Sequence, residues 1–121
     1  MSAVKLSECF IENIDSGNEK KMIFLSSQMG SIDDNASGGC YIYRSTKASL
    51  NAVVKSLSVD LRQRNISALV LHPGWVLTDM GGPNAQITTE VSVAGMRKVI
   101  SNLSIKNSGS FLDYEGSPIL W

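Results

Sequence analysis

The sequence predicts an α/β protein built on a parallel β-sheet. Three short segments have the length of strands, at residues 22–25, 66–71 and 110–113, and the first two are apolar or nearly so. Each segment follows a longer stretch in which apolar residues recur at helical spacing. Strands that alternate with long helices form parallel sheets with right-handed crossovers. Because the chain has 121 residues, 43% of them hydrophobic, we expect a single domain over 1–121 with a core of its own.

Three helices are expected. The first spans residues 3–14, the second spans 43–64, and the third begins where Thr88 or Thr89 caps it and reaches Leu103. The second helix has the clearest pattern, because apolar side chains recur at i, i+3, i+4, i+7 and i+11 and no Gly or Pro interrupts them. These side chains are Leu50, Val53, Val54, Leu57 and Leu61.

The first two strand candidates are continuous apolar runs and do not alternate with polar residues. This pattern is typical of strands whose two faces are both buried, as in a parallel sheet. A polar, glycine-containing loop follows the first strand from Ser26 to Cys40, and His72, Pro73 and Gly74 close the second strand.

The charge pattern excludes two classes of partner. The chain has 11 basic and 11 acidic side chains, and the basic ones are scattered, so we expect no binding to nucleic acid or to an anionic membrane. No apolar run approaches the ~20 residues that a bilayer span needs. Acidic residues interrupt the first helix where a signal peptide would be apolar. We therefore expect a cytoplasmic protein.

The cysteines and the single histidine give no metal site. Cys9 and Cys40 are too few for a disulfide scaffold, and we expect both to be reduced and buried as small hydrophobic side chains. A zinc site would need both of them, His72 and a carboxylate without any motif spacing, so we expect no metal. A Cys–His nucleophilic pair stays formally open, although neither cysteine adjoins a cationic cluster that would activate it.

Polar residues follow the strands at the edge of the sheet where chemistry is expected. Ligands of open parallel sheets bind beyond the carboxyl ends of the strands. Ser26 and Ser27 follow the first strand, and residues 72–78 follow the second. The second helix opens with Tyr43 and Lys47, which share one helix face at i and i+4. A nearby cation stabilises a phenolate, and this favours tyrosine as a general acid/base.

Taken in order, these motifs resemble those of the short-chain dehydrogenase/reductase family. The runs that match are Met22–Gly30, Tyr43–Ser49 and His72–Thr78. Residues 38–44 and 78–84 are closer still to the branch of C-factor and carbonyl-reductase-like proteins. Each motif alone is weak, but their combination and order are specific, and the resemblance spans essentially the whole chain.

The resemblance implies roles for seven residues. Ser27, Tyr43 and Lys47 would be the catalytic residues: the tyrosine exchanges a proton with the reacting oxygen, the serine binds that oxygen, and the lysine supports the tyrosine. Tyr43 and Lys47 would also bind the cofactor, together with the stretch that holds the nicotinamide carboxamide, namely Pro73, Gly74, Val76 and Thr78. Tyr41 is a poor competitor for the acid/base role, because Ser45 stands four residues after it. The loop from Gly81 into the last helix would form the substrate wall.

The resemblance also implies a cofactor of which this chain binds only one end. NAD or NADP is expected, with NADP favoured by the branch. The family's glycine-rich turn, which receives the pyrophosphate, is absent, because no Gly-x-x-x-Gly-x-Gly occurs in the chain. The expected fold is therefore a partial Rossmann-like, doubly wound parallel sheet of about three strands with helices. It lacks the amino-terminal glycine-rich βαβ unit, and residues 1–121 form the carboxyl-terminal, catalytic half.

Two functions follow from the resemblance. The first is an NAD(P)-dependent oxidoreductase that transfers hydride between nicotinamide and a carbonyl or alcohol substrate. The alternative is a shortened, non-catalytic signalling or interaction protein of C-factor type, or an incomplete gene product. In either case residues 22–25 would form an unpaired apolar edge strand, so we expect self-association or a partner chain.

Overall fold

The computed structural model describes residues 2–121 as alternating helices and strands, which confirms the predicted α/β class. In chain order the elements are α1 (Ala3–Ser16), β1 (Lys21–Leu25), the 3₁₀ turn η1 (Gln28–Gly30), α2 (Tyr41–Asp60), the 3₁₀ turn η2 (Arg62–Arg64), β2 (Ser67–His72), α3 (Thr89–Ser101) and β3 (Ser110–Asp113). No helix in this part of the chain is both long enough and apolar enough to cross a bilayer.

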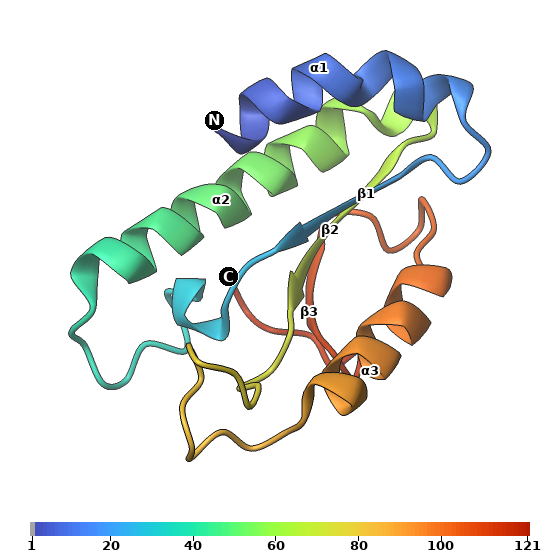
Figure 1. Cartoon of the computed structure of the whole chain (residues 1–121). Coiled ribbons are helices and arrows are strands. Elements are labelled where there is room, and N and C mark those ends of the chain that lie inside the picture. Colours follow the sequence, from blue (N-terminus) through green and yellow to red (C-terminus); the bar gives the residue numbers. More distant parts are fainter. Residues whose placement is uncertain (1) are drawn as a thin grey trace.

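The three strands form one parallel sheet in the order β1-β2-β3 (Figure 1). In the register, Ile23 lies beside Leu69 and Leu71 lies beside Leu112. Because all three strands run the same way, their carboxyl ends meet at one edge of the sheet. Ser26, which follows β1, continues this ladder and donates its backbone N–H to Leu71 O at 2.9 Å.

Helices cover both faces of the sheet, α1 and α2 on one side and α3 on the other (Figure 1). Toward α2, the core contains Val54, Ala68, Val70 and Phe111. Toward α3, Leu69 and Leu71 pack against Val99 and Leu103. Successive side chains of β2 therefore enter two different cores, which explains why its sequence is a continuous apolar run.

Helix boundaries differ from the predicted ones where the apolar pattern carries no information. α2 begins at Tyr41 instead of residue 43, although Tyr41 and Ile42 are more than 80% exposed. Its first turn makes no core contact, so hydrophobic spacing does not mark it. The helix gives way to η2 before residue 64, and Asn65 ends the segment in a left-handed conformation with φ 58°. Thr88 is the cap of α3, since its Oγ1 accepts from Val91 N–H at 3.4 Å.

Ion pairs attach α1 to the end of the α2 segment. Arg64 donates to Glu12 and to Asp15 at 2.9 and 2.8 Å, and Lys20 donates to Asp15 at 2.9 Å. Hydrogen bonds from Lys20 and Arg64 lower the pKa of Asp15 below its ordinary 3.8. These groups are solvent-accessible, so their contribution to stability is small.

The cysteines do not lie where the sequence suggested. Cys9 and Cys40 are free, but both are exposed, so the expectation that they are buried hydrophobic side chains is wrong. Cys40 stands directly before α2 in a left-handed conformation with φ 47°, after two glycines that also have positive φ. Cys40 therefore lies in the loop that leads into α2, outside the two cores on the faces of the sheet.

β1 pairs with a strand on one side only, within residues 2–121. The expected apolar edge is therefore present, and Leu25 at its end is 54% exposed. Such an edge leaves backbone donors and acceptors available to another strand.

Candidate functional site

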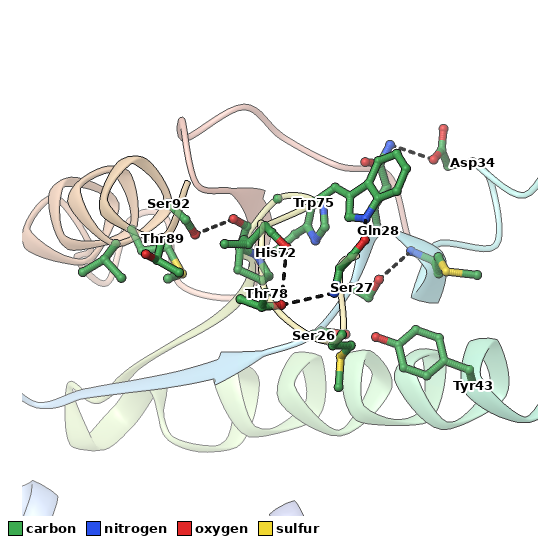
Figure 2. Close-up of a pocket in the computed structure, with 18 of the residues that line it drawn as sticks. Ser26, Ser27, Gln28, Asp34, Tyr43, His72, Trp75, Thr78, Thr89 and Ser92 are labelled. Atoms are coloured by element: carbon green, nitrogen blue, oxygen red, sulfur yellow. Dashed lines mark hydrogen bonds between the residues drawn. The ribbon is translucent and has the colours of Figure 1, made fainter. Parts of the chain in front are cut away.

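A pocket of about 790 Å³ opens at the carboxyl edge of the sheet, between the loops that follow β1 and β2 and the amino-terminal ends of α2 and α3 (Figure 2). Six of the seven predicted site residues line it: Ser27, Tyr43, Pro73, Gly74, Val76 and Thr78. Lys47 is the exception. The structure thus brings together residues from three separate parts of the sequence.

The two serines after β1 have different environments. Ser26 is 5% exposed and donates its hydroxyl proton to Asn51 Oδ1 at 2.7 Å. Ser27 is half-buried, and its Oγ accepts from Met29 N–H at 3.2 Å as the cap of η1. The proton of the Ser27 hydroxyl therefore stays available to a ligand in the pocket. Of the two, Ser27 has the accessible hydroxyl.

Tyr43 and Lys47 lie one turn apart on α2. The phenol oxygen of Tyr43 points toward the part of the pocket lined by Ser26 and Ser27 (Figure 2). Lys47 Nζ lies 5.7 Å from the centre of the Tyr43 ring and 3.5 Å from Leu25 O, to which it donates. The ammonium thus lies behind the tyrosine at the end of β1. Tyr41, 84% exposed, does not line the pocket.

The turn after β2 requires glycine at position 74. Gly74 has φ 86°, and a Cβ there would lie 2.6 Å from Ile87 Cδ1 and 3.0 Å from the ring of Tyr114. α3 supports the same turn, because buried Ser92 donates its hydroxyl to Pro73 O at 2.6 Å (Figure 2). The backbone of this stretch is therefore fixed from two sides.

The following loop is closed by its own hydrogen bonds. Trp75 Nε1 donates to Gly81 O at 2.7 Å, and Leu77 N–H donates to Ile87 O at 2.8 Å. Thr78 Oγ1 accepts from Gly81 N–H at 3.1 Å and donates to Val76 O at only 3.4 Å. From the loop 81–88, which was expected to form the substrate wall, Gly81 lines the pocket. Met80 before the loop and Thr89, Ser92, Val93 and Met96 of α3 also line this side.

The stretch after β2 keeps polar groups that a ligand amide could use. A carboxamide needs a donor for its oxygen and an acceptor for its amide group. Val76 N–H donates to no backbone carbonyl within residues 2–121, and the Thr78 hydroxyl is engaged by one long bond as a donor. Both groups lie at the pocket, whereas the chain contains no glycine-rich turn for the pyrophosphate.

His72 lines the pocket, whereas the sequence offered it only as a ligand of a metal site that was not expected and as the partner in a Cys–His pair that stayed open. It is the last residue of β2, beside Asp113 in the register. Its Nδ1 is buried without a hydrogen-bond partner. Burial lowers the pKa of the imidazole below its ordinary 6.5, and the charge of Asp113 acts in the opposite direction. The ring is therefore neutral near pH 7.

Other pocket residues were also missed. Ser92 lies on the face of α3 that packs against the sheet, together with Met96 and Val99. A serine among the buried residues of a helix needs a hydrogen-bond partner, so the sequence pattern could have identified Ser92 as a residue with a polar contact. Trp75, Met80 and Met29 gave no comparable signal, because single apolar residues in loops have no pattern. Across residues 2–121 no three metal-ligating side chains converge.

Comparison with known families and proteins gives consistent results. A family model described as short chain dehydrogenase matches residues 1–88. The C-signal protein of Myxococcus xanthus is 40% identical over 121 residues, which is all of this chain and 73% of that protein. A 1-hydroxy-2-glutathionyl-2-methyl-3-butene dehydrogenase of Rhodococcus sp. is 40% identical over 84% of this chain and 46% of its own length.

Solved structures agree with these matches. The carbonyl reductase Sniffer of D. melanogaster superimposes with a TM-score of 0.91 at 39% identity. The NADPH-bound carbonyl reductase from chicken fatty liver superimposes with a TM-score of 0.89 at 38% identity. Each comparison covers 98% of this chain and 52% of the other, so the chain spans about half the length of these reductases.

The unpaired Nδ1 of His72 predicts an unusual titration. Ionisation would place an N–H on a buried atom that has no acceptor, so NMR titration of this sole histidine should give a pKa below 6.5. Asp113→Asn should lower the pKa further, because it removes the favourable charge. A pKa at or above 6.5 would contradict the assignment.

The same shift predicts how stability depends on pH. The unfolded chain binds the proton first as pH falls, so the free energy of unfolding should decrease from about pH 6.5 down to the pKa of His72 in the folded protein. Above pH 6.5 this contribution should be constant. Urea unfolding at several pH values checks it, and His72→Gln should remove the dependence in that window.

Proposed function

The chain belongs to the short-chain dehydrogenase family, and on that premise we propose that it is the carboxyl-terminal, catalytic half of an NAD(P)-dependent oxidoreductase of carbonyl compounds and alcohols. The observation that supports this most is the convergence of Ser27, Tyr43 and Thr78 on one pocket. These residues are far apart in sequence, and each has the chemistry that hydride transfer to a carbonyl group requires. The substrate is a small molecule with a carbonyl or alcohol group.

Tyr43 is the acid/base of the proposed reaction. Reduction of a carbonyl group adds a hydride to the carbon and a proton to the oxygen. The phenol donates this proton, and it takes the proton back when an alcohol is oxidised. Ser27 donates a hydrogen bond to the same oxygen, which stabilises the negative charge that develops there and orients the substrate.

Lys47 assists from behind the tyrosine. Its ammonium lies on the sheet side of Tyr43, at the carbonyl of Leu25, and its positive charge favours the phenolate. In the same position it can donate to a ribose hydroxyl beside the nicotinamide. It need not line the pocket for the first of these roles.

The stretch after β2 binds the nicotinamide. Val76 N–H and the Thr78 hydroxyl would bind its carboxamide, and Pro73 and Gly74 belong to the same side of the pocket. When bound, the nicotinamide supplies the hydride that carbonyl reduction consumes. NADP is our preferred cofactor, since the chicken reductase is described with NADPH bound.

We also place the protein in the cytoplasm, in keeping with its two free, exposed cysteines.

A second candidate is a signalling or interaction role without catalysis. The 40% identity with the C-signal protein over the whole chain favours it, as does the lack of a glycine-rich turn in these 121 residues. Such a role would depend on surface contacts and would not need the Tyr43 hydroxyl. Turnover and cofactor binding therefore separate the two candidates.

Tyr43→Phe should abolish turnover without unfolding the protein. In a form of the protein that is active, the rate of carbonyl reduction should fall by ~10² to 10⁴, the usual contribution of a positioned acid/base. Tyr41→Phe is the matched control, because this tyrosine is exposed and outside the pocket, and it should keep the full rate. A Tyr43→Phe rate within twofold of the wild type would remove Tyr43 from the mechanism.

The 121-residue chain alone should not bind NADH or NADPH saturably. Each hydrogen bond to the nicotinamide end contributes ~0.5–1.5 kcal/mol, which leaves a few kcal/mol before the entropy of association is subtracted. That corresponds to millimolar affinity or weaker. A fluorescence titration with cofactor up to hundreds of micromolar should show no plateau. This concentration range is about that of ordinary enzyme affinities. A low-micromolar dissociation constant would mean that another chain or an unrecognised site binds the phosphates.

We also propose that the chain self-associates or binds a partner chain through the β1 edge. Light scattering at tens of micromolar, roughly where exposed edges associate, should give a mass above one chain. Leu25→Lys should reduce it, because a charge at the edge opposes pairing. Val59→Lys, at an equally exposed position on α2, should not. A monomer at these concentrations would contradict the proposal.

A further inference from the structure

Side chains on one face of α2 hydrogen-bond to the backbone of the loop that follows β1. Arg44, Lys47 and Asn51 are spaced i, i+3 and i+7, so they lie on one face of the helix. Lys47 and Arg44 donate to backbone carbonyls of the segment from Leu25 to Gly30, at 3.5 and 3.4 Å, and so does Asn51, at 3.4 Å. Ser27 lies in the middle of this segment, and Tyr43 lies on α2.

The strongest contact is a buried pair of polar side chains. The Ser26 hydroxyl donates to Asn51 Oδ1 at 2.7 Å, and Asn51 Nδ2 donates to Gly30 O at 3.4 Å. Ser26 is 5% exposed and Asn51 is 3% exposed. One asparagine therefore bonds the residue directly before Ser27 and the residue that ends the turn capped by Ser27.

The helix and the loop also meet too closely for a side chain at position 30. A Cβ on Gly30 would lie 2.8 Å from Lys47 Cβ and 3.1 Å from Asn51 Nδ2. Arg44 adds a second tie, since its guanidinium bonds Met29 O and, at 2.9 Å, Ser37 Oγ. The loop therefore has little freedom to shift along α2.

We propose that Ser26 and Asn51 are positioning residues, which set the place of the Ser27 hydroxyl relative to the Tyr43 phenol. The inference rests on the proposed function, because it matters only if these two hydroxyls act on one substrate oxygen. Ser26 also lines the pocket, but its hydroxyl proton is donated to Asn51 and the residue is 5% exposed, so we assign it a positioning role and not substrate binding. A displacement of ~1 Å between catalytic groups can reduce a rate about 10²-fold.

A purely structural role makes a different prediction. Two buried polar groups that satisfy each other can be replaced together by apolar groups at little cost in stability. The variant Ser26→Ala/Asn51→Leu leaves neither hydroxyl nor amide of this pair unpaired, so it should still fold, with stability lowered by the loss of the 3.4 Å bond from Asn51 Nδ2 to Gly30 O. Its loop would lose the bonds that position Ser27. Stability and turnover should separate in this variant.

The test is a double-mutant cycle on turnover in an active form of the protein. Ser26→Ala, Asn51→Leu and the double variant should each lower kcat, by ~10- to 100-fold. The double variant should lower it no more than Asn51→Leu, because Asn51→Leu already breaks the bond to Ser26 as well as the bond to Gly30 O. The KM for the cofactor should stay within twofold, since the stretch after β2 is untouched. Ser56→Ala is the matched control: its hydroxyl bonds Ala52 O on the outer side of α2, and kcat should not change.

Each outcome has a defined meaning. A double variant that is folded by its melting curve and keeps kcat within twofold of the wild type overturns the inference, even where a single variant does not fold. Multiplicative effects of the two single changes also overturn it, because Ser26 would then act independently of Asn51. A wild type without turnover, or an unaffected Tyr43→Phe, overturns the proposed function and the inference with it.

Discussion

The burial of β2 on both faces is the constraint from which the position of the site follows. The side chains of Ala68, Leu69, Val70 and Leu71 alternate between the α2 core and the α3 core, so the strand carries polar side chains only at its two ends, Ser67 and His72. The parallel neighbours end at the same edge. The serines after β1 and the turn after β2 therefore meet there, and the pocket forms between them.

Much of this arrangement could be predicted from local patterns. A continuous apolar run such as 66–71 has only one stable environment in an α/β chain, the middle of a sheet covered on both sides. Tyr43 and Lys47 were placed on one helix face by their spacing alone. The resemblance carried by these motifs in order then named seven residues, six of which line a common pocket.

Other features depend on tertiary contacts that no local pattern encodes. One side of the pocket is formed by α3 and depends on how this helix packs on the sheet, where Ser92 donates to Pro73 O. The exposure of Cys40 results from three consecutive left-handed residues before α2, and a small apolar side chain does not reveal this. The unpaired Nδ1 of His72 likewise depends on what surrounds the end of β2.

The parallel pairing of β1 with β2 also has a consequence for how the chain folds. The two strands are separated by the whole of α2 and its flanking loops, so their hydrogen bonds close a long loop. Contacts of this kind form slowly, because the chain loses the entropy of loop closure before the strand hydrogen bonds can stabilise the closed loop. During synthesis the pairing of β1 with β2 has to wait until β2 has emerged from the ribosome. α2, whose contacts are local, can form in the meantime and bring the two strands within reach of each other.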